Sequence, residues 1–154
     1  MRVRDVLGRS FVAVDADSPL HLIAEKMKVE DVGLIGVLSS GRIVGVVTDR
    51  DLVMRVLAPL SEPSMLTAWD VMTRDPVCID EEATLDKAIE IMRDRRLRRL
   101  IVLRQDGFPL GVVSVSDLSR YSEKAIEIVR ALASKPQVLR SPGAGIASKT
   151  ILMP

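Results

Sequence analysis

The chain has 154 residues, of which 47% are hydrophobic and 28% charged; this suffices for one sizeable core but is short for two independent domains. The 22 Lys and Arg against 21 Asp and Glu give a formal net charge of +1, so no overall attraction to nucleic acid or an anionic membrane is expected. The single cysteine, Cys78, excludes an internal disulfide framework and a clustered-thiolate zinc site. Aromatic residues make up only 3%, which disfavours stacking surfaces for single-stranded nucleic acid.

We expect no targeting segment at the start of the sequence. The sequence reaches the charged Asp5 before any apolar stretch of signal-peptide length, and no run of about 18 consecutive apolar residues occurs anywhere. We therefore expect a cytoplasmic protein without a membrane span.

The sequence contains an internal repeat. Asp5-Val6-Leu7 matches Asp70-Val71-Met72 at a shift of 70 minus 5, or 65 residues. After one inserted residue the shift becomes 66, which carries Asp51 to Asp117. The insertion falls in a Gly-containing turn, where insertions are tolerated. The chain therefore consists of two copies of one structural unit.

Each copy shows the same order of hydrophobic periods. Alternation at Val12 and Val14 predicts a strand, and Ser18-Pro19 predicts the N-cap and first residue of a helix. The apolar stripe of that helix is Leu20, Ile23, Ala24 and Met27, repeated as Leu85, Ala88, Ile89 and Met92. Hairpins are predicted over 34–47 and 100–113, each followed by a helix, which begins near Asp49 and near Val115. This predicts an α+β fold of two β-α-β-β-α repeats, packed sheet against sheet.

The predicted boundaries follow changes in composition. The first repeat covers 1–58, a linker containing Pro59 and Pro63 covers 59–68, and the second repeat covers 69–133. The second repeat ends in a helix with Ile126, Val129 and Ala133 on one face. Residues 134–154, rich in Pro and Gly and without an acidic residue, are expected to form a flexible tail.

The most informative motif occurs once per copy, as Gly45-Val46-Val47-Thr48-Asp49-Arg50-Asp51 and as Gly111-Val112-Val113-Ser114-Val115-Ser116-Asp117. A hydroxyl residue three positions before an acid, where a strand meets a helix, is a capping box that satisfies free helix amides. Alternatively, the carboxylate faces a cleft and accepts both hydroxyls of a ribose, beside amides that favour an anion. One carboxylate cannot serve both roles in full.

Both copies resemble cystathionine-β-synthase (CBS) domains, arranged as the tandem pair. The resemblance spans about Val3 to Glu123 and rests on the order of elements and on the repeated motif. It implies two repeats packed with pseudo-two-fold symmetry, forming a non-catalytic regulatory module with two clefts for adenine nucleotides (AMP, ADP or ATP) or S-adenosylmethionine. It also implies a homodimer that forms through helices.

The resemblance assigns residues to both clefts. The first would use Ser114 and Asp117 for the ribose, Val112 against the base, and a segment from the other copy comprising Ser10, Phe11, Val12, Val32 and Gly33. The second would use Thr48 and Asp51 with Val46, Arg74, Pro76, Val77 and Cys78.

The copies differ where a phosphate would lie. The second copy carries Arg98 and Arg99, while the first has Val32-Gly33 at the matching positions. Guanidinium groups suit phosphate oxygens, so Arg98 and Arg99 are candidate phosphate contacts, and Arg50 could partly compensate in the other cleft. We therefore predict unequal sites, with the Ser114/Asp117 cleft tighter for AMP.

Other chemistry finds little support. His21 has no second His or Cys at metal-ligand spacing, and Cys78 has no evident base, so neither a metal site nor an enzyme is predicted. The arginines around Arg95 are typical of a solvated helix end rather than a nucleic-acid patch. The prediction is an adenine-nucleotide sensor, AMP favoured, that signals to an unidentified regulated protein by population shift. The alternative is a structural interaction module with empty clefts, in which both motifs only cap helices.

Overall fold

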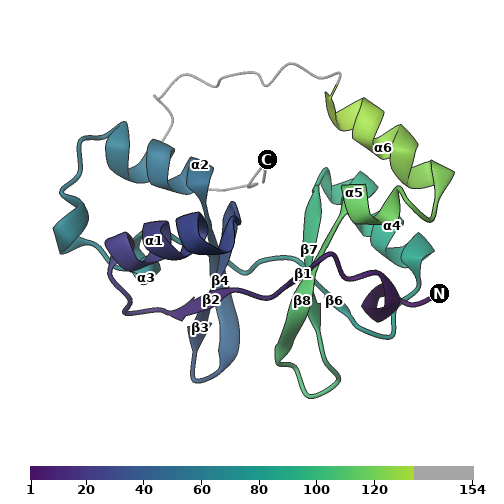
Figure 1. Ribbon diagram of the computed structural model, residues 1–154, viewed down its shortest axis with the longest axis horizontal. Coiled ribbons are helices and arrows are strands. Elements are labelled where there is room, and N and C mark those ends of the chain that lie inside the picture. The colour runs from purple at the N-terminus through teal and green to yellow at the C-terminus, as the bar shows by residue number, and fades with distance from the viewer. Residues whose placement is uncertain (134–154) are drawn as a thin grey trace.

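The structure is a computed structural model that describes residues 1–133; the predicted tail at 134–154 lies outside the described residues. Two four-stranded sheets face each other, with helices on their outer sides (Figure 1), so the predicted α+β fold is confirmed. In chain order the elements are the 3₁₀ turn η1 (Val3–Val6), β1 (Arg9–Ser10), β2 (Ala13–Asp15), α1 (Leu20–Glu30), β3 (Leu34–Ser39), β4 (Arg42–Thr48), α2 (Asp49–Leu52), the π-helix η2 (Val53–Leu57), the 3₁₀ turn η3 (Pro63–Met65), α3 (Ala68–Val71), β5 (Thr73–Arg74), β6 (Cys78–Asp80), α4 (Leu85–Arg95), β7 (Arg99–Leu103), β8 (Pro109–Ser114), α5 (Val115–Leu118) and α6 (Glu123–Ala133).

The two sheets have the same topology. Their strand orders are β2-β3-β4-β5 and β1-β8-β7-β6. In each sheet a parallel pair, β2 with β3 or β6 with β7, leads into an antiparallel hairpin. The hairpins even share an irregularity, because the register shifts between Val37 and Leu38 in one and between Val102 and Leu103 in the other. The sequence repeat is thus a structural repeat.

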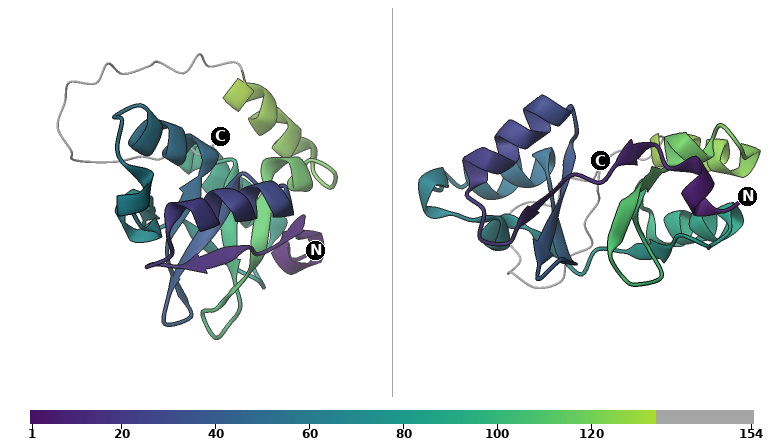
Figure 2. Two further views of the ribbon diagram at one scale, coloured as in Figure 1. Left: turned by 60° about the vertical axis from the view of Figure 1, so that its left-hand side comes forward. Right: turned by 60° about the horizontal axis from the view of Figure 1, so that its bottom comes forward.

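The fourth strand of each sheet comes from the segment that precedes the other repeat. β1 pairs with β8, and β5 pairs with β4. The right view of Figure 2 shows the N-terminal segment crossing from one unit to the other. Val3 and Val6 of η1 are buried in the core around β7 and β8, while Ala68 and Val71 of α3 are buried in the core around β3 and β4. Neither core is complete without the segment it receives.

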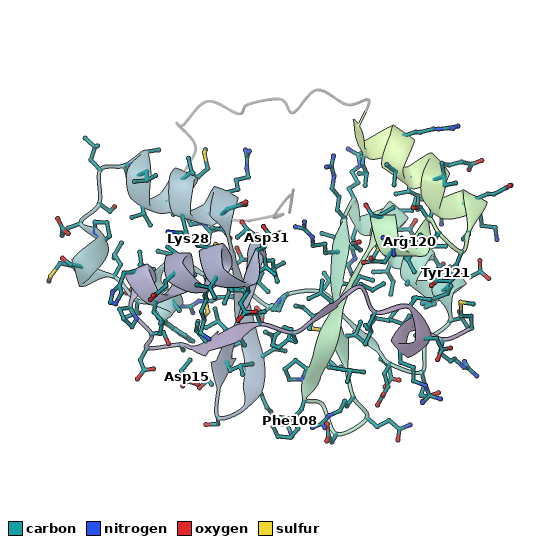
Figure 3. The ribbon with its side chains drawn as sticks, viewed as in Figure 1. Asp15, Lys28, Asp31, Phe108, Arg120 and Tyr121 are labelled. Atoms are coloured by element: carbon teal, nitrogen blue, oxygen red, sulfur yellow. The ribbon has the colours of Figure 1, made fainter. Side chains whose placement is uncertain are left out.

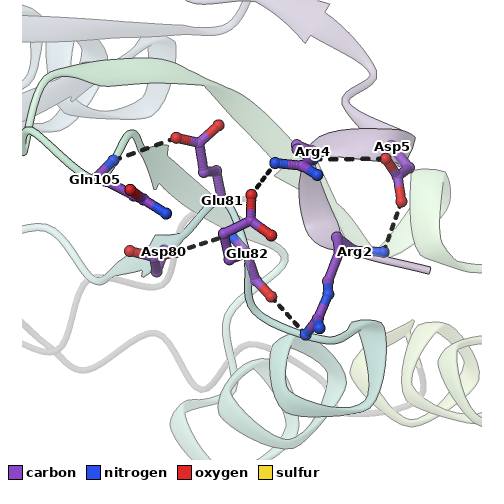
Figure 4. Close-up of polar contacts among 7 residues, drawn as sticks. All are labelled: Arg2, Arg4, Asp5, Asp80, Glu81, Glu82 and Gln105. Carbon is purple, nitrogen blue, oxygen red and sulfur yellow. Dashed lines mark hydrogen bonds and ion pairs between the residues drawn. The ribbon is translucent and has the colours of Figure 1, made fainter.

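Polar contacts hold the N-terminal segment in place (Figure 4). The Arg2 guanidinium donates to the Glu82 carbonyl at 2.9 Å, and Arg4 forms an ion pair with the Glu82 carboxylate. The backbone N–H of Val3 donates to the Ala83 carbonyl at 2.9 Å. Because ion pairs at the surface contribute little, burial of the η1 valines supplies most of the binding energy of this segment.

A third apolar cluster joins the facing sheets. Its buried members are Leu34 and Val46 from one sheet and Ile101 from the other. Phe11, between β1 and β2, packs against this cluster and lies directly over Gly36, where a Cβ would overlap its ring. The predicted packing of sheet against sheet is confirmed.

The predicted start of the first long helix was wrong. α1 begins at Leu20, and Pro19, with an extended backbone (ψ 151°), is its N-cap instead of its first helical residue. Ser18 does not cap the helix. An N-cap carbonyl accepts the first hydrogen bond of its own helix, but the Ser18 carbonyl instead accepts the Ala68 N–H of α3, the helix that precedes the second repeat, at 2.8 Å. In the other copy, Thr84 does cap α4, accepting the Lys87 N–H at 3.2 Å.

Exchange of the N-terminal segment predicts that Val3 stabilises a core far from it in sequence. Val3→Ala removes apolar volume from a fully buried site, and we expect it to lower the free energy of unfolding by about 2 kcal/mol. Val29→Ala, at a valine that is 73% exposed, is the matched control and should change it by less than about 0.5 kcal/mol. Equal effects of the two variants in urea denaturation would contradict the exchange.

Candidate functional site

A cavity of about 490 Å³ lies where elements of both repeats meet. β7, β8, α5 and α6 of the second repeat line it, together with residues before β2 and β3 of the first. Eight residues predicted for the first cleft are among its lining: Val12, Val32, Gly33, Arg98, Arg99, Val112, Ser114 and Asp117. The structure therefore brings most of this predicted constellation together.

Phe11, which was predicted for this cleft, lies elsewhere. The Phe11 ring packs in the cluster between the sheets, over Gly36, and does not line the cavity. Ser10 contributes its backbone to β1, paired with Gly111, and its side chain lies outside the described residues.

Ser114 and Asp117 form a complete capping box at the start of α5. Asp117 Oδ2 accepts the Ser114 N–H at 2.9 Å and the Ser114 hydroxyl at 2.5 Å, and Ser114 Oγ in turn accepts the Asp117 N–H at 3.1 Å. The other carboxylate oxygen, Oδ1, accepts no hydrogen bond from residues 1–133. Capping therefore uses one oxygen of Asp117 and leaves the second for another donor.

Sequence reasoning missed Gly8, which lines the cavity and packs against the Asp117 carboxylate. A Cβ at position 8 would overlap the carboxylate oxygens. At the shift of 65 the other copy has Thr73 at the position of Gly8. This difference could not be interpreted from the sequence, because it depends on the pairing of β1 with β8, next to the start of α5. Gly8 thus gives the backbone its close approach to the carboxylate.

Arginine side chains dominate the charge of the cavity. Arg98 and Arg99 enter from the start of β7, and Arg120, which sequence reasoning missed, enters from just after α5, beneath α6 in the view of Figure 3. Among the described residues that line the cavity, Asp117 is the only acidic one. At the shift of 66, Arg120 corresponds to Met54, so this cation too distinguishes the two copies. The cavity attracts anions.

α6 supplies a further part of the lining. Val129 and Leu132 face the cavity, and the Leu132 carbonyl accepts a hydrogen bond from Arg98 Nη2 at 3.3 Å. The helix was predicted with Ile126 and Val129 on its apolar face, but the structure buries Ala125 and Ile128 instead. Its place over the cavity was not predicted, because only tertiary packing sets it.

The matching constellation of the first repeat is arranged differently. Thr48 and Asp51 are 1% and 6% exposed, and the Thr48 N–H donates to Asp51 Oδ2 at 2.9 Å. Asp51 Oδ1 lies 3.7 Å from Arg55 Nη2, and the Arg55 guanidinium also donates to the carbonyls of Val71 and Met72 at 2.7 and 2.9 Å. Both oxygens of Asp51 are therefore engaged by the chain itself.

Other residues predicted for the second cleft contact the core or other surface side chains. Val46 is buried between the sheets, and Val77 packs on the core around β7 and β8. The Arg74 guanidinium lies over the Trp69 ring, 4.2 Å from its centroid.

Cys78 also belongs to the cluster between the sheets, and its thiol donates to the Pro76 carbonyl at 3.3 Å. Burial raises the pKa of the Cys78 thiol, so the group stays protonated at neutral pH and is a poor nucleophile. Within residues 1–133, no group of three or more His, Cys, Asp or Glu side chains is placed to hold a metal ion. In the same part of the chain, no helix has the length and apolar character needed to cross a membrane.

Two pseudo-symmetric β-α-β-β-α units that exchange edge strands and enclose a cavity between them define a tandem CBS domain pair. The sequence profile of the CBS domain matches residues 3–58 and 68–124, so the chain belongs to the CBS domain family.

Relatives agree with this assignment. The uncharacterized protein YlbB of Bacillus subtilis is 39% identical over 120 residues, covering 77% of this chain and 80% of YlbB. A conserved CBS domain protein of unknown function from Thermoplasma acidophilum has a TM-score of 0.74 at 20% identity, covering 88% of this chain and 78% of its own. A CBS domain protein from Pyrobaculum aerophilum, solved in complex with AMP, has a TM-score of 0.69 at 24% identity, covering 88% of this chain and 100% of its own.

The contact between Gly8 and Asp117 can be tested without a ligand. Gly8→Ala should push the carboxylate out of its capping position and lower the free energy of unfolding by about 1 kcal/mol. In an Asp117→Ala background the same change should be neutral or slightly stabilising, because no carboxylate remains to be displaced. Additive costs in this double-mutant cycle, measured by urea denaturation, would disprove the contact.

Proposed function

We propose that this protein is a non-catalytic sensor that binds an adenine nucleotide, AMP in preference to ADP, ATP or S-adenosylmethionine, in the cavity at Ser114 and Asp117. The observation that carries the proposal is the Asp117 carboxylate, which lines the cavity while its Oδ1 accepts no hydrogen bond from residues 1–133. A ribose diol supplies the two donors that this oxygen lacks. The AMP complex of the Pyrobaculum aerophilum protein supports this choice.

The remaining lining suits the other parts of a nucleotide. Val12, Val32 and Val112 offer an apolar slot for the base. Arg98, Arg99 and Arg120 supply guanidinium groups for the phosphate. The same cations disfavour S-adenosylmethionine, whose sulfonium is itself positively charged.

The two clefts are proposed to be unequal. Asp51 is buried, and its outer oxygen is paired with Arg55, so a ribose would have to displace an internal contact. At the shift of 66 the second repeat has Tyr121 in place of Arg55, and no such pairing engages Asp117 among the described residues. We expect the Asp117 cleft to bind AMP more tightly.

One observation favours the alternative, an interaction module whose motifs only cap helices. Thr67 and Asp70 form the same capping box at the start of α3, where Asp70 Oδ2 accepts the Thr67 N–H at 2.8 Å, and these residues do not line the cavity. Capping alone thus explains the pattern of residues, and only a ligand-binding experiment separates the two functions.

Replacing Asp117 in two ways separates binding from capping. Asp117→Asn can keep its carbonyl on the Ser114 N–H but presents an amide donor to the ribose, so AMP affinity should fall at least 30-fold with little loss of stability. Asp117→Ala should lose AMP binding and also about 1 kcal/mol of stability. Isothermal titration calorimetry with AMP, ATP and S-adenosylmethionine, and urea denaturation, measure both effects.

The matched control is Asp51→Asn in the other repeat, which should leave AMP affinity within about twofold. Equal losses in Asp51→Asn and Asp117→Asn would show that the clefts are equivalent. Saturable AMP binding that survives Asp117→Asn would exclude the proposed site, and no binding heat with any adenosine ligand would favour the interaction module.

We further infer that the protein acts in the cytoplasm as a homodimer that passes its conformational change to a regulated protein. The surface proposed for the second copy is the helical face of Val53, Met54 and Leu57, which are 50%, 50% and 63% exposed. Met54→Glu should shift sedimentation from dimer to monomer and lower the thermal unfolding midpoint by no more than dilution of the wild-type dimer does. A wild-type protein that sediments as a monomer at micromolar concentration would exclude the dimer.

A further inference from the structure

α6 lies almost entirely beyond the residues that the CBS profile matches. The CBS profile ends at residue 124, whereas α6 covers Glu123–Ala133. One face of the helix is fixed in the second core, where Ala125 and Ile128 are 0% and 7% exposed. Further along, Val129 and Leu132 line the cavity that holds Ser114 and Asp117. α6 thus packs against the second core with some of its residues and lines the cavity with others.

We propose that α6 is a ligand-binding wall of the cleft and that Arg98 couples its last turn to the phosphate of the bound nucleotide. The inference rests on the proposed function and adds to it the element through which binding is sensed. Its basis is the position of Arg98, which lines the cavity and at the same time donates to the Leu132 carbonyl at 3.3 Å.

The residue four positions after Leu132 is Pro136, which has no backbone N–H, so the Leu132 carbonyl lacks the donor that a regular α-helix would supply. A guanidinium at this end of a helix is favourable because the helix dipole is negative there. A guanidinium carries five N–H donors in one rigid plane, so Arg98 can bind the carbonyl with one donor and a phosphate with others.

A phosphate beside Arg98 changes the strength of this link. Arg98 is exposed, and its guanidinium donates one hydrogen bond within residues 1–133, to the neutral Leu132 carbonyl. Charge-assisted bonds to a phosphate are stronger and fix the guanidinium in one orientation. A fixed guanidinium holds the Leu132 carbonyl for more of the time, so AMP stabilises the last turn of α6. Because coupling is reciprocal, the last turn of α6 in turn increases AMP affinity.

Amide hydrogen exchange of the full chain tests the coupling. AMP at saturation should slow exchange of the amides of residues 129–133 at least threefold, while adenosine, which lacks the phosphate, should slow β8 and α5 but not these amides. If AMP binds with an Asp117-dependent heat and leaves 129–133 unchanged, the inference is wrong and the proposed function stands. If adenosine protects 129–133 as well as AMP does, the coupling through Arg98 is wrong. If no Asp117-dependent heat appears, both are wrong.

Two matched pairs of variants locate the effect. Arg98→Gln should abolish the protection of 129–133 and weaken AMP binding about tenfold, whereas Arg95→Gln, at an exposed arginine outside the cavity, should change neither. Val129→Asp places a carboxylate on the cavity wall and should weaken AMP about tenfold by repulsion, whereas Ile126→Asp should stay within about threefold. Val129 and Ile126 are 39% and 37% exposed, so neither change should unfold the helix. Equal effects within either pair would overturn the inference.

Discussion

Pairing of β1 with β8 is the contact on which the cavity depends. This pairing carries the N-terminal segment across to the second sheet and sets Gly8 against the Asp117 carboxylate. The chain then returns to its own sheet through Val12, which becomes part of the lining. The cavity therefore joins residues more than a hundred positions apart, and anything that loosens η1 or β1 also opens the site. Folding of the two cores and formation of the site are consequently linked.

The repeated motif shows how one residue pattern serves different ends according to its neighbours. At Ser114 the box caps α5 with a single carboxylate oxygen, and at Thr67 the same box caps α3 away from the cavity. At Thr48 the outer oxygen of the acid pairs with Arg55. Capping is common to all three, so it explains the residue types, while the environment of the second oxygen decides which box can bind a ligand. Position in the fold, more than the motif, separates these roles.

Local sequence patterns predicted the helices and strands. The features that the sequence did not predict depend on contacts between residues far apart in the chain. The stripes of α1 and α4 and the two hairpins follow from hydrophobic periods, because one face of each must be buried. The exchange of edge strands has no such signal, since β1 and β5 are two residues long and pair with the far sheet. The wrong helix start at Ser18 has the same origin: the exchanged helix α3 uses the Ser18 carbonyl. In the cavity, Arg98 and Ser114 follow from residue type and resemblance, whereas Gly8, Arg120 and Val129 are brought there only by tertiary packing.

A nucleotide can shift the conformation of a protein only by binding one arrangement more tightly than another. Contacts confined to one rigid sheet would bind AMP without reporting it, because they are the same in every arrangement. In this chain the cavity is walled by two repeats and by α6, which is anchored early in its length and meets the cavity at its end. Leu132 near the end of α6 is only partly buried against the second core, whereas Ala125 and Ile128 are buried in it, so hydrogen bonds contribute relatively more to the order of the last turn. In the proposal above, α6 is thus the element whose order a ligand in the cavity changes.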